Sequence, residues 1–165
     1  MRKNIILKGQ VIYVINIDDV KIRLMNIEDV DGVMNVETRC FKIAWSKESF
    51  LYEMKENNKA LYVIAEYEGN ILGYAGLWKI LDEGHITNIA VLDEYRRNGI
   101  ATRMLDTLIN LAKEQDVKSF TLEVKHTNNS AINLYENFGF SACGLRKGYY
   151  KDTNDDAIIM WKNKD

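Results

Sequence analysis

Apolar positions recur along this chain with two different spacings, and the two kinds of segment are interleaved. Short runs rich in valine, isoleucine and aromatic residues predict β-strands, whereas apolar residues three or four positions apart predict amphipathic helices. The most regular helix covers 99–115, where one face carries Met104, Leu105, Leu108, Leu111 and Ala112. The predicted strands, in chain order, are 11–17, 20–24, 61–67, 71–80, 85–91, 119–125, 140–146 and 157–161.

Capping and turn residues divide these segments. Asn26 and Ser46 are good helix caps, so helices are predicted to begin at Ile27 and just after Ser46, and a further short helix covers 130–138. The turn at 68–70 joins two strands into a hairpin, and the helix 99–115 links the strands 85–91 and 119–125 as a crossover. This order predicts an α/β fold in which a mixed sheet is flanked by helices.

The length of 165 residues predicts one domain, 1–165. Within it, residues 20–165 form the core, and residues 1–19 form an N-terminal extension that we expect to pair onto the sheet. The chain contains no proline, so each of its turns is shaped without a covalently restricted φ.

Composition excludes several classes of function. Twenty-two basic against 24 acidic residues give a net charge of −2, which disfavours nucleic acid as a partner. No apolar run approaches 18 residues, and no signal peptide is evident, so no membrane partner is expected. Cys40 and Cys143 stand alone, as in a cytoplasmic protein, and His85 and His126 have no ligand-like spacing, so no metal is expected.

The segment 88–101 carries the clearest chemistry. A strand ends at Val91, a charged loop follows, and the helix begins at Gly99. The first N–H groups of a helix have no internal partner and bind anions, and Arg96 and Arg97 add charge suited to a phosphate. Neither a Walker loop nor the three-glycine dinucleotide motif is present. On these residues alone, Gly99 could equally be a small residue that starts a helix beside two solvated arginines.

Further segments of the sequence, taken together with this loop, resemble the pattern of a known family. Arg96-x-x-Gly99-x-Ala101 after the strand 88–91 resembles the acetyl-CoA pyrophosphate loop of the GNAT acetyltransferases, and the blocks 122–124, Asn128 and 134–140 follow in the same order. The segments 44–46, 146–150 and 155–160 resemble the RimI branch, which acetylates the N-terminal alanine of a ribosomal protein. The resemblance covers 22–160 and implies the GNAT fold, a largely antiparallel central sheet flanked by helices. Most relatives carry a proline just after the strand, where this chain has Leu92-Asp93, and the loop between Tyr150 and Ala157 also differs.

The resemblance implies acetyl-CoA as cosubstrate. In this family the strand splays from its neighbour, so that the pantetheine arm pairs with Ile89 and Val91, and a backbone N–H there polarises the thioester carbonyl. A buried strand with no such role explains these residues equally well. The implied cofactor-binding residues are Ile89, Ala90, Val91, Arg96, Arg97, Asn98, Gly99, Ile100, Ala101, Thr102 and Asn128.

The same resemblance assigns two catalytic residues. Glu123, on the polar face of an alternating strand, is the implied general base, and the alternative is a solvated glutamate on an edge strand. Tyr135 is the implied general acid that protonates the CoA thiolate, although its helical spacing also fits a core tyrosine. Asn128 likewise fits a helix cap.

The acceptor site is the least defined. Trp45, Tyr149 and Tyr150 either line a groove for a peptide N-terminus, with Asp155 or Asp156 near its ammonium, or pack in the core. The expected reaction is acetylation of a protein α-amine, that of the N-terminal alanine of a small-subunit ribosomal protein. Two alternatives stay open, a GNAT enzyme for a small-molecule amine and a non-catalytic acyl-CoA-binding module. The sequence leaves the oligomeric state open.

Overall fold

A seven-stranded sheet forms the centre of the protein. The computed structural model describes residues 3–163, and its sheet has the order β3-β4-β5-β6-β7-β9-β8. Every neighbouring pair is antiparallel except β6 and β7, which confirms the predicted mixed, largely antiparallel sheet. The strands are β3 (Lys21–Leu24), β4 (Ala60–Tyr67), β5 (Asn70–Ile80), β6 (Glu83–Val91), β7 (Ser119–Lys125), β8 (Ser141–Tyr150) and β9 (Asp155–Lys162).

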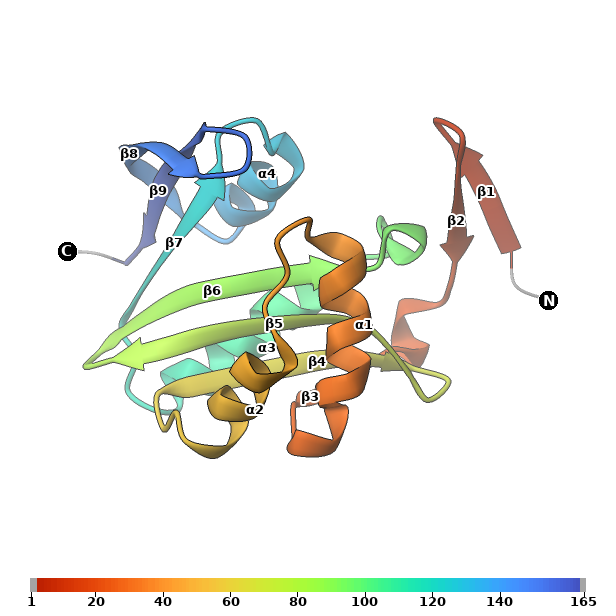
Figure 1. The fold of residues 1–165 in the computed structure, drawn as a ribbon, viewed down its shortest axis with the longest axis horizontal. Coiled ribbons are helices and arrows are strands. Elements are labelled where there is room, and N and C mark those ends of the chain that lie inside the picture. Colours follow the sequence, from red (N-terminus) through yellow and green to blue (C-terminus); the bar gives the residue numbers. More distant parts are fainter. Residues whose placement is uncertain (1–2, 164–165) are drawn as a thin grey trace.

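Helices cover both faces of the sheet (Figure 1). Between residues 3 and 163 the α-helices are α1 (Val30–Cys40), α2 (Lys47–Lys55), α3 (Ile100–Lys113) and α4 (Asn129–Asn137). Alternation along β4 shows how the layers form, because Val63 belongs to the core with α3 and Ile64 to the core with α1 and α2. As predicted, the Ser46 side chain caps α2, whereas the Asn26 cap starts a single 3₁₀ turn before α1.

The strand–helix–strand crossover places the candidate site. β6, α3 and β7 follow one another, and β6 and β7 pair in parallel over only three residues, from Glu83–Ser119 to His85–Thr121. Beyond His85 the two strands diverge, with β7 leading toward α4, β8 and β9 (Figure 1). The second half of β6 therefore has a neighbour, β5, on one side only.

The expectation that the N-terminal extension pairs onto the sheet is wrong. Residues 3–14 form a separate hairpin of β1 (Lys3–Leu7) and β2 (Gln10–Val14), which stands beside the sheet (Figure 1). Its turn residues Lys8 and Gly9 both have positive φ, 49° and 80°, as a two-residue hairpin turn requires. This turn folds the segment back on itself, so that β2 pairs with β1 instead of extending the sheet beyond β3.

Candidate functional site

The free side of β6 offers backbone groups to a ligand. The Leu92 N–H donates to the Leu72 carbonyl of β5 at 2.8 Å, so the alternate residues Ile89 and Val91 direct their backbone groups away from β5. The ladder with β7 ends at His85 and does not reach them. The Val91 carbonyl accepts from Arg96 Nε at 3.1 Å. The backbone groups of Ile89 and the Val91 N–H therefore face the side of β6 that the ladder with β7 does not reach.

The N-terminus of α3 fits an anion. Gly99 precedes the helix with φ of 78°, and no side-chain cap bonds to the first turn of α3. A Cβ at Gly99 would meet nothing within 4 Å, so the approach to the first N–H groups is open. The residues that follow are Ile100, Ala101 and Thr102, and the first intrahelical bond links Arg103 N to the Gly99 carbonyl. Open N–H groups at a helix start are suited to a phosphate.

The two arginines of the loop differ. Arg96 pairs with Asp93 at 2.8 Å and also holds the Val91 carbonyl, so its charge is partly used inside the loop. Arg97 is exposed, has a φ of 64°, and makes no ion pair with any residue in 3–163. Asn98 bonds to the N-terminal extension through its side chain, donating to the Tyr13 carbonyl at 2.8 Å. Of the three, Arg97 is the residue free to meet an anion.

Glu123 lies where β7 has parted from β6. Its neighbour is Ile159 of β9, and its side chain is 27% exposed. The carboxylate forms an ion pair with Arg146 of β8 at 3.3 Å. Locally Glu123 thus borders the opening between β6 and β7, which suits a base that exchanges protons with a bound acceptor.

Two tyrosines of β8 accompany Glu123. The rings of Tyr149 and Tyr150 lie 5.2 Å apart, and the Arg146 guanidinium lies 5.9 Å from the Tyr149 ring. Burial, followed by the charges of Tyr149 and Glu123, raises the pKa of Tyr150 to about 12. Burial and Glu123 also raise the pKa of Tyr149. Two of the three predicted acceptor residues, Tyr149 and Tyr150, therefore lie close enough to the predicted base for its charge to raise their pKa values.

Tyr135 and Asn128 occupy α4 and its cap. Tyr135 is 8% exposed and packs on Phe140 with ring centres 5.9 Å apart. Burial raises its pKa, and the charge of Tyr150 makes a smaller contribution in the same direction. Asn128 caps α4, because its Oδ1 accepts from the Ala131 N–H at 3.2 Å.

The remaining acceptor candidates lie elsewhere or are already paired. The Trp45 ring packs on Phe50 at 5.6 Å in the core between the sheet and α1 and α2, and does not join the Glu123 cluster. Asp155 pairs with Lys125 at 2.5 Å, and the Asp156 carboxylate accepts from the Gly148 N–H at 2.9 Å. Both aspartates thus hold the end of the β8–β9 hairpin.

Two buried carboxylates were not predicted as functional. Glu37 of α1 is 1% exposed and accepts from the Trp45 N–H at 2.8 Å and from the Tyr74 hydroxyl. Glu53 of α2 accepts from the Tyr62 hydroxyl, the Trp78 indole and Asn57. An acid at apolar helical spacing is the sequence feature that could have revealed Glu37, which shares its face with Val30 and Val33.

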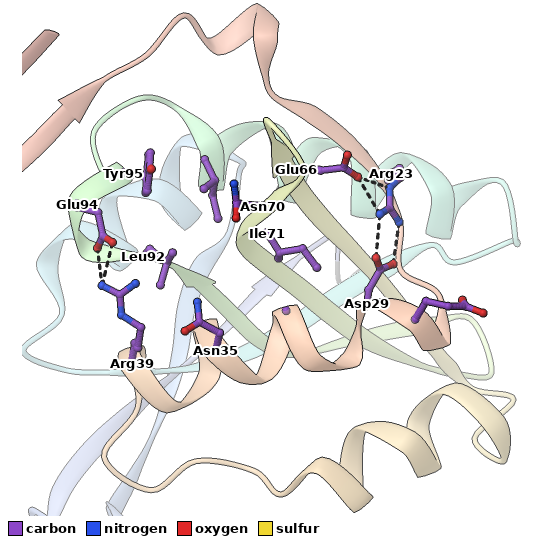
Figure 2. A pocket seen from close by; sticks show the side chains of 14 residues that line it. Arg23, Asp29, Asn35, Arg39, Glu66, Asn70, Ile71, Leu92, Glu94 and Tyr95 are labelled. Carbon is purple, nitrogen blue, oxygen red and sulfur yellow. Dashed lines mark hydrogen bonds and ion pairs between the residues drawn. The ribbon is translucent and has the colours of Figure 1, made fainter. Parts of the chain in front are cut away.

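A polar cavity of about 540 Å³ lies between α1, the β4–β5 turn and the 3₁₀ turn Asp93–Tyr95. Figure 2 shows Arg23 bound to Asp29 and Glu66 at one end, and Arg39 bound to Glu94 at the other. None of the predicted site residues lines it. Both of its arginines are already paired with acids.

The described residues contain neither a metal-binding cluster nor a membrane-spanning helix. Between residues 3 and 163, no cluster of three or more histidine, cysteine or acidic side chains is arranged to hold a metal ion. No helix in that range has the length and hydropathy needed to cross a membrane.

Comparison with known proteins places this geometry in a family. Residues 30–140 match the family model described as Acetyltransferase (GNAT) family. A candidate ribosomal protein bS18-alanine N-acetyltransferase from Bacillus subtilis (strain 168) is 40% identical over 140 residues, covering 85% of this chain and 93% of the relative. The ribosomal protein bS18-alanine N-acetyltransferase of Escherichia coli (strain K12) is 33% identical over 134 residues, covering 80% and 89%. The crystal structure of the ribosomal-protein-S18-alanine N-acetyltransferase from Escherichia coli matches with a TM-score of 0.79 and 31% identity, covering 87% of this chain and 92% of that one.

Proposed function

Since the chain belongs to the acetyltransferase (GNAT) family, we propose that it acetylates a protein N-terminal α-amine, that of the alanine that begins ribosomal protein bS18. Residues 20–165 would form the catalytic core, and residues 1–19 an extension. One observation carries the proposal for the site: a carboxylate, Glu123, stands beside two tyrosines where β6 and β7 separate.

The cofactor site is assigned to the free side of β6 and the start of α3. Acetyl-CoA, when bound, supplies the acetyl group as a thioester. Ile89 and Val91 would bind its extended arm through backbone groups, while the first N–H groups of α3 and the exposed Arg97 would bind its phosphates. The side-chain oxygens of Asn98 and Asn128 already accept hydrogen bonds from backbone N–H groups. These two residues would therefore help to shape the site, and would not be its main ligands.

Glu123 would remove a proton from the acceptor ammonium. An α-amine has a pKa of about 7.7, whereas a lysine side chain has one of about 10.4, so an α-amine is partly neutral at pH 7. The base therefore needs to remove a proton from only part of the acceptor molecules, which suits a partly exposed glutamate that is ion-paired with Arg146. Tyr149 and Tyr150 would form one wall for the N-terminal residues of the acceptor.

Tyr135 would act on the leaving thiolate. Burial raises the pKa of its phenol, so the hydroxyl stays protonated across the physiological range. A phenol with its ordinary pKa of about 10 is already a weaker acid than a thiol, whose pKa is about 8.5, and the shift widens this difference. Tyr135 would therefore stabilise the thiolate mainly by donating a hydrogen bond.

The test is mass spectrometry of synthetic peptides after incubation with acetyl-CoA. The panel contains the bS18 N-terminus beginning with alanine, the same peptide beginning with serine or methionine, an N-terminally blocked control, and a set of small amines. We expect a gain of one acetyl group on the alanine peptide and none on the blocked control. Turnover of small amines without any peptide product would instead support a small-molecule acetyltransferase, and CoA binding without turnover a non-catalytic module.

A further inference from the structure

The N-terminal extension contacts the loop that precedes α3. We call residues 3–19 the arm. The side-chain amide of Asn98 in the loop binds the arm twice, donating to the Tyr13 carbonyl at 2.8 Å and accepting from the Ile15 N–H at 3.2 Å. The same amide donates to the Tyr95 carbonyl at 3.0 Å. One side chain thus connects the arm to the backbone of the loop.

Two further contacts reinforce this connection. The Tyr13 ring packs on the Tyr95 ring at 5.3 Å between centres. On the other side of the loop, the Arg103 guanidinium in the first turns of α3 donates to the Ile17 carbonyl. The arm therefore holds the 3₁₀ turn, the loop and the start of α3 at three separate points.

The segment between these contacts is conformationally costly. Arg97 and Gly99 both have left-handed φ, 64° and 78°, on either side of Asn98, and the cost falls on Arg97 because glycine adopts this conformation freely. A non-glycine residue adopts this conformation only where its surroundings impose it. The bonds of Asn98 to the arm are such surroundings, because they fix the residue that lies between the two left-handed positions.

We infer that the arm is a positioning element for acetyl-CoA: it holds the loop 96–99 in its cofactor-binding conformation before the cofactor arrives. This inference rests on the proposed cofactor site and goes beyond it. The matched part of the family model begins at residue 30, so the arm lies outside the region that identifies the family. Tyr13 is the principal positioning residue of the arm, since its ring and its carbonyl both contact the loop.

The test compares Tyr13→Ala, Tyr13→Leu and Tyr13→Phe in the full-length protein. Tyr13→Phe keeps the ring, Tyr13→Leu keeps apolar bulk without a ring, and Ile6→Thr is a control on the same hairpin at a position that is 77% exposed. Thermal melts establish that each variant is folded. Isothermal titration with CoA and steady-state kinetics with the alanine peptide then separate cofactor binding from the rest of the reaction.

We expect a selective loss of cofactor affinity. If the arm keeps most molecules in the binding conformation, its loosening raises the Kd for CoA and the KM for acetyl-CoA about five- to tenfold, in proportion to the lost population. Tyr13→Leu should lie between Tyr13→Ala and wild type, whereas Tyr13→Phe and Ile6→Thr should stay within about twofold. The peptide KM and kcat should be unchanged. General destabilisation would not change the cofactor constants while leaving the peptide constants as they are.

Hydrogen exchange distinguishes the two ways of failing. In wild type, CoA should slow amide exchange over residues 97–102. Absence of that protection would overturn the proposed cofactor site itself. Protection in wild type together with an unchanged CoA affinity in folded Tyr13→Ala and Tyr13→Leu would overturn the role of the arm alone.

Discussion

Replacing Glu37 by leucine should destabilise the protein by leaving two buried donors without an acceptor. Glu37 is 1% exposed, and its two carboxylate oxygens accept from the Trp45 N–H and the Tyr74 hydroxyl. Trp45 belongs to the connection between α1 and α2, and Tyr74 lies in β5. The carboxylate therefore joins that connection to the sheet, and leucine removes the acceptor of both donors.

The magnitude follows from the groups left behind. Each buried donor without a partner costs about 1–3 kcal/mol, and relief of the buried charge offsets part of this, so Glu37→Leu should lose about 2–4 kcal/mol of unfolding free energy. Adding Tyr74→Phe removes one orphaned donor and should recover about 1–2 kcal/mol. Glu37→Gln should lose about 1–2 kcal/mol, because its amide oxygen can still accept from Trp45 and its NH₂ can donate to the Tyr74 oxygen, so that only the Tyr74 hydroxyl proton loses its acceptor.

Urea unfolding of the four proteins measures these differences. A double variant no more stable than Glu37→Leu alone would refute the argument that an orphaned Tyr74 hydroxyl causes the loss.

Three further outcomes follow from the structure. Glu123→Gln should lower kcat by about 10²–10⁴-fold at an unchanged Kd for CoA, as measured by steady-state kinetics and titration, since only proton removal is lost. Burial raises the pKa of Tyr135 and Tyr150 in the folded protein, whereas unfolded tyrosines ionise near pH 10. The unfolding free energy should therefore be fully retained below about pH 10 and fall above it, because ionisation then favours the unfolded state. Urea midpoints that hold steady up to about pH 11 would contradict this. Asp93→Pro should be about 0.4–1 kcal/mol more stable than Asp93→Ala in thermal melts, because the preceding Leu92, at φ −50° and ψ 134°, already has the conformation favoured before proline.

The crossover that carries the proposed cofactor site was predictable because its pattern is local. The helix period from Met104 to Ala112 and the alternation from Phe120 to Lys125 each fix an element without reference to the rest of the chain. The early end of the parallel ladder at His85 was not predictable from those periods. It depends on how β7 pairs with β9, which lies more than thirty residues further on.

The residues missed by sequence reasoning are those whose role depends on a distant partner. Glu37 shows this most simply: its helical spacing places an acid on an apolar face, but Tyr74, which makes that burial tolerable, is 37 residues away. Arg146 and Glu123 form an ion pair only because β8 and β7 both pair with β9. The arm was misplaced for a related reason, since the pattern of a short strand does not specify which neighbour it pairs with.

Because the chain contains no proline, non-covalent contacts alone must hold the conformation of the proposed cofactor loop. This chain shapes the loop with hydrogen bonds instead of a covalently restricted φ: Leu92 N–H to the Leu72 carbonyl, Arg96 to the Val91 carbonyl, and Asn98 to the Tyr13 carbonyl. A proline at residue 92 could not make the first of these bonds, because it lacks the N–H. A φ restriction acts in the unfolded chain as well, whereas these bonds exist only once β5 and the arm are in place. The proposed cofactor loop should therefore lose its conformation when its contacts with β5 or with the arm are loosened, even while α3 itself remains folded.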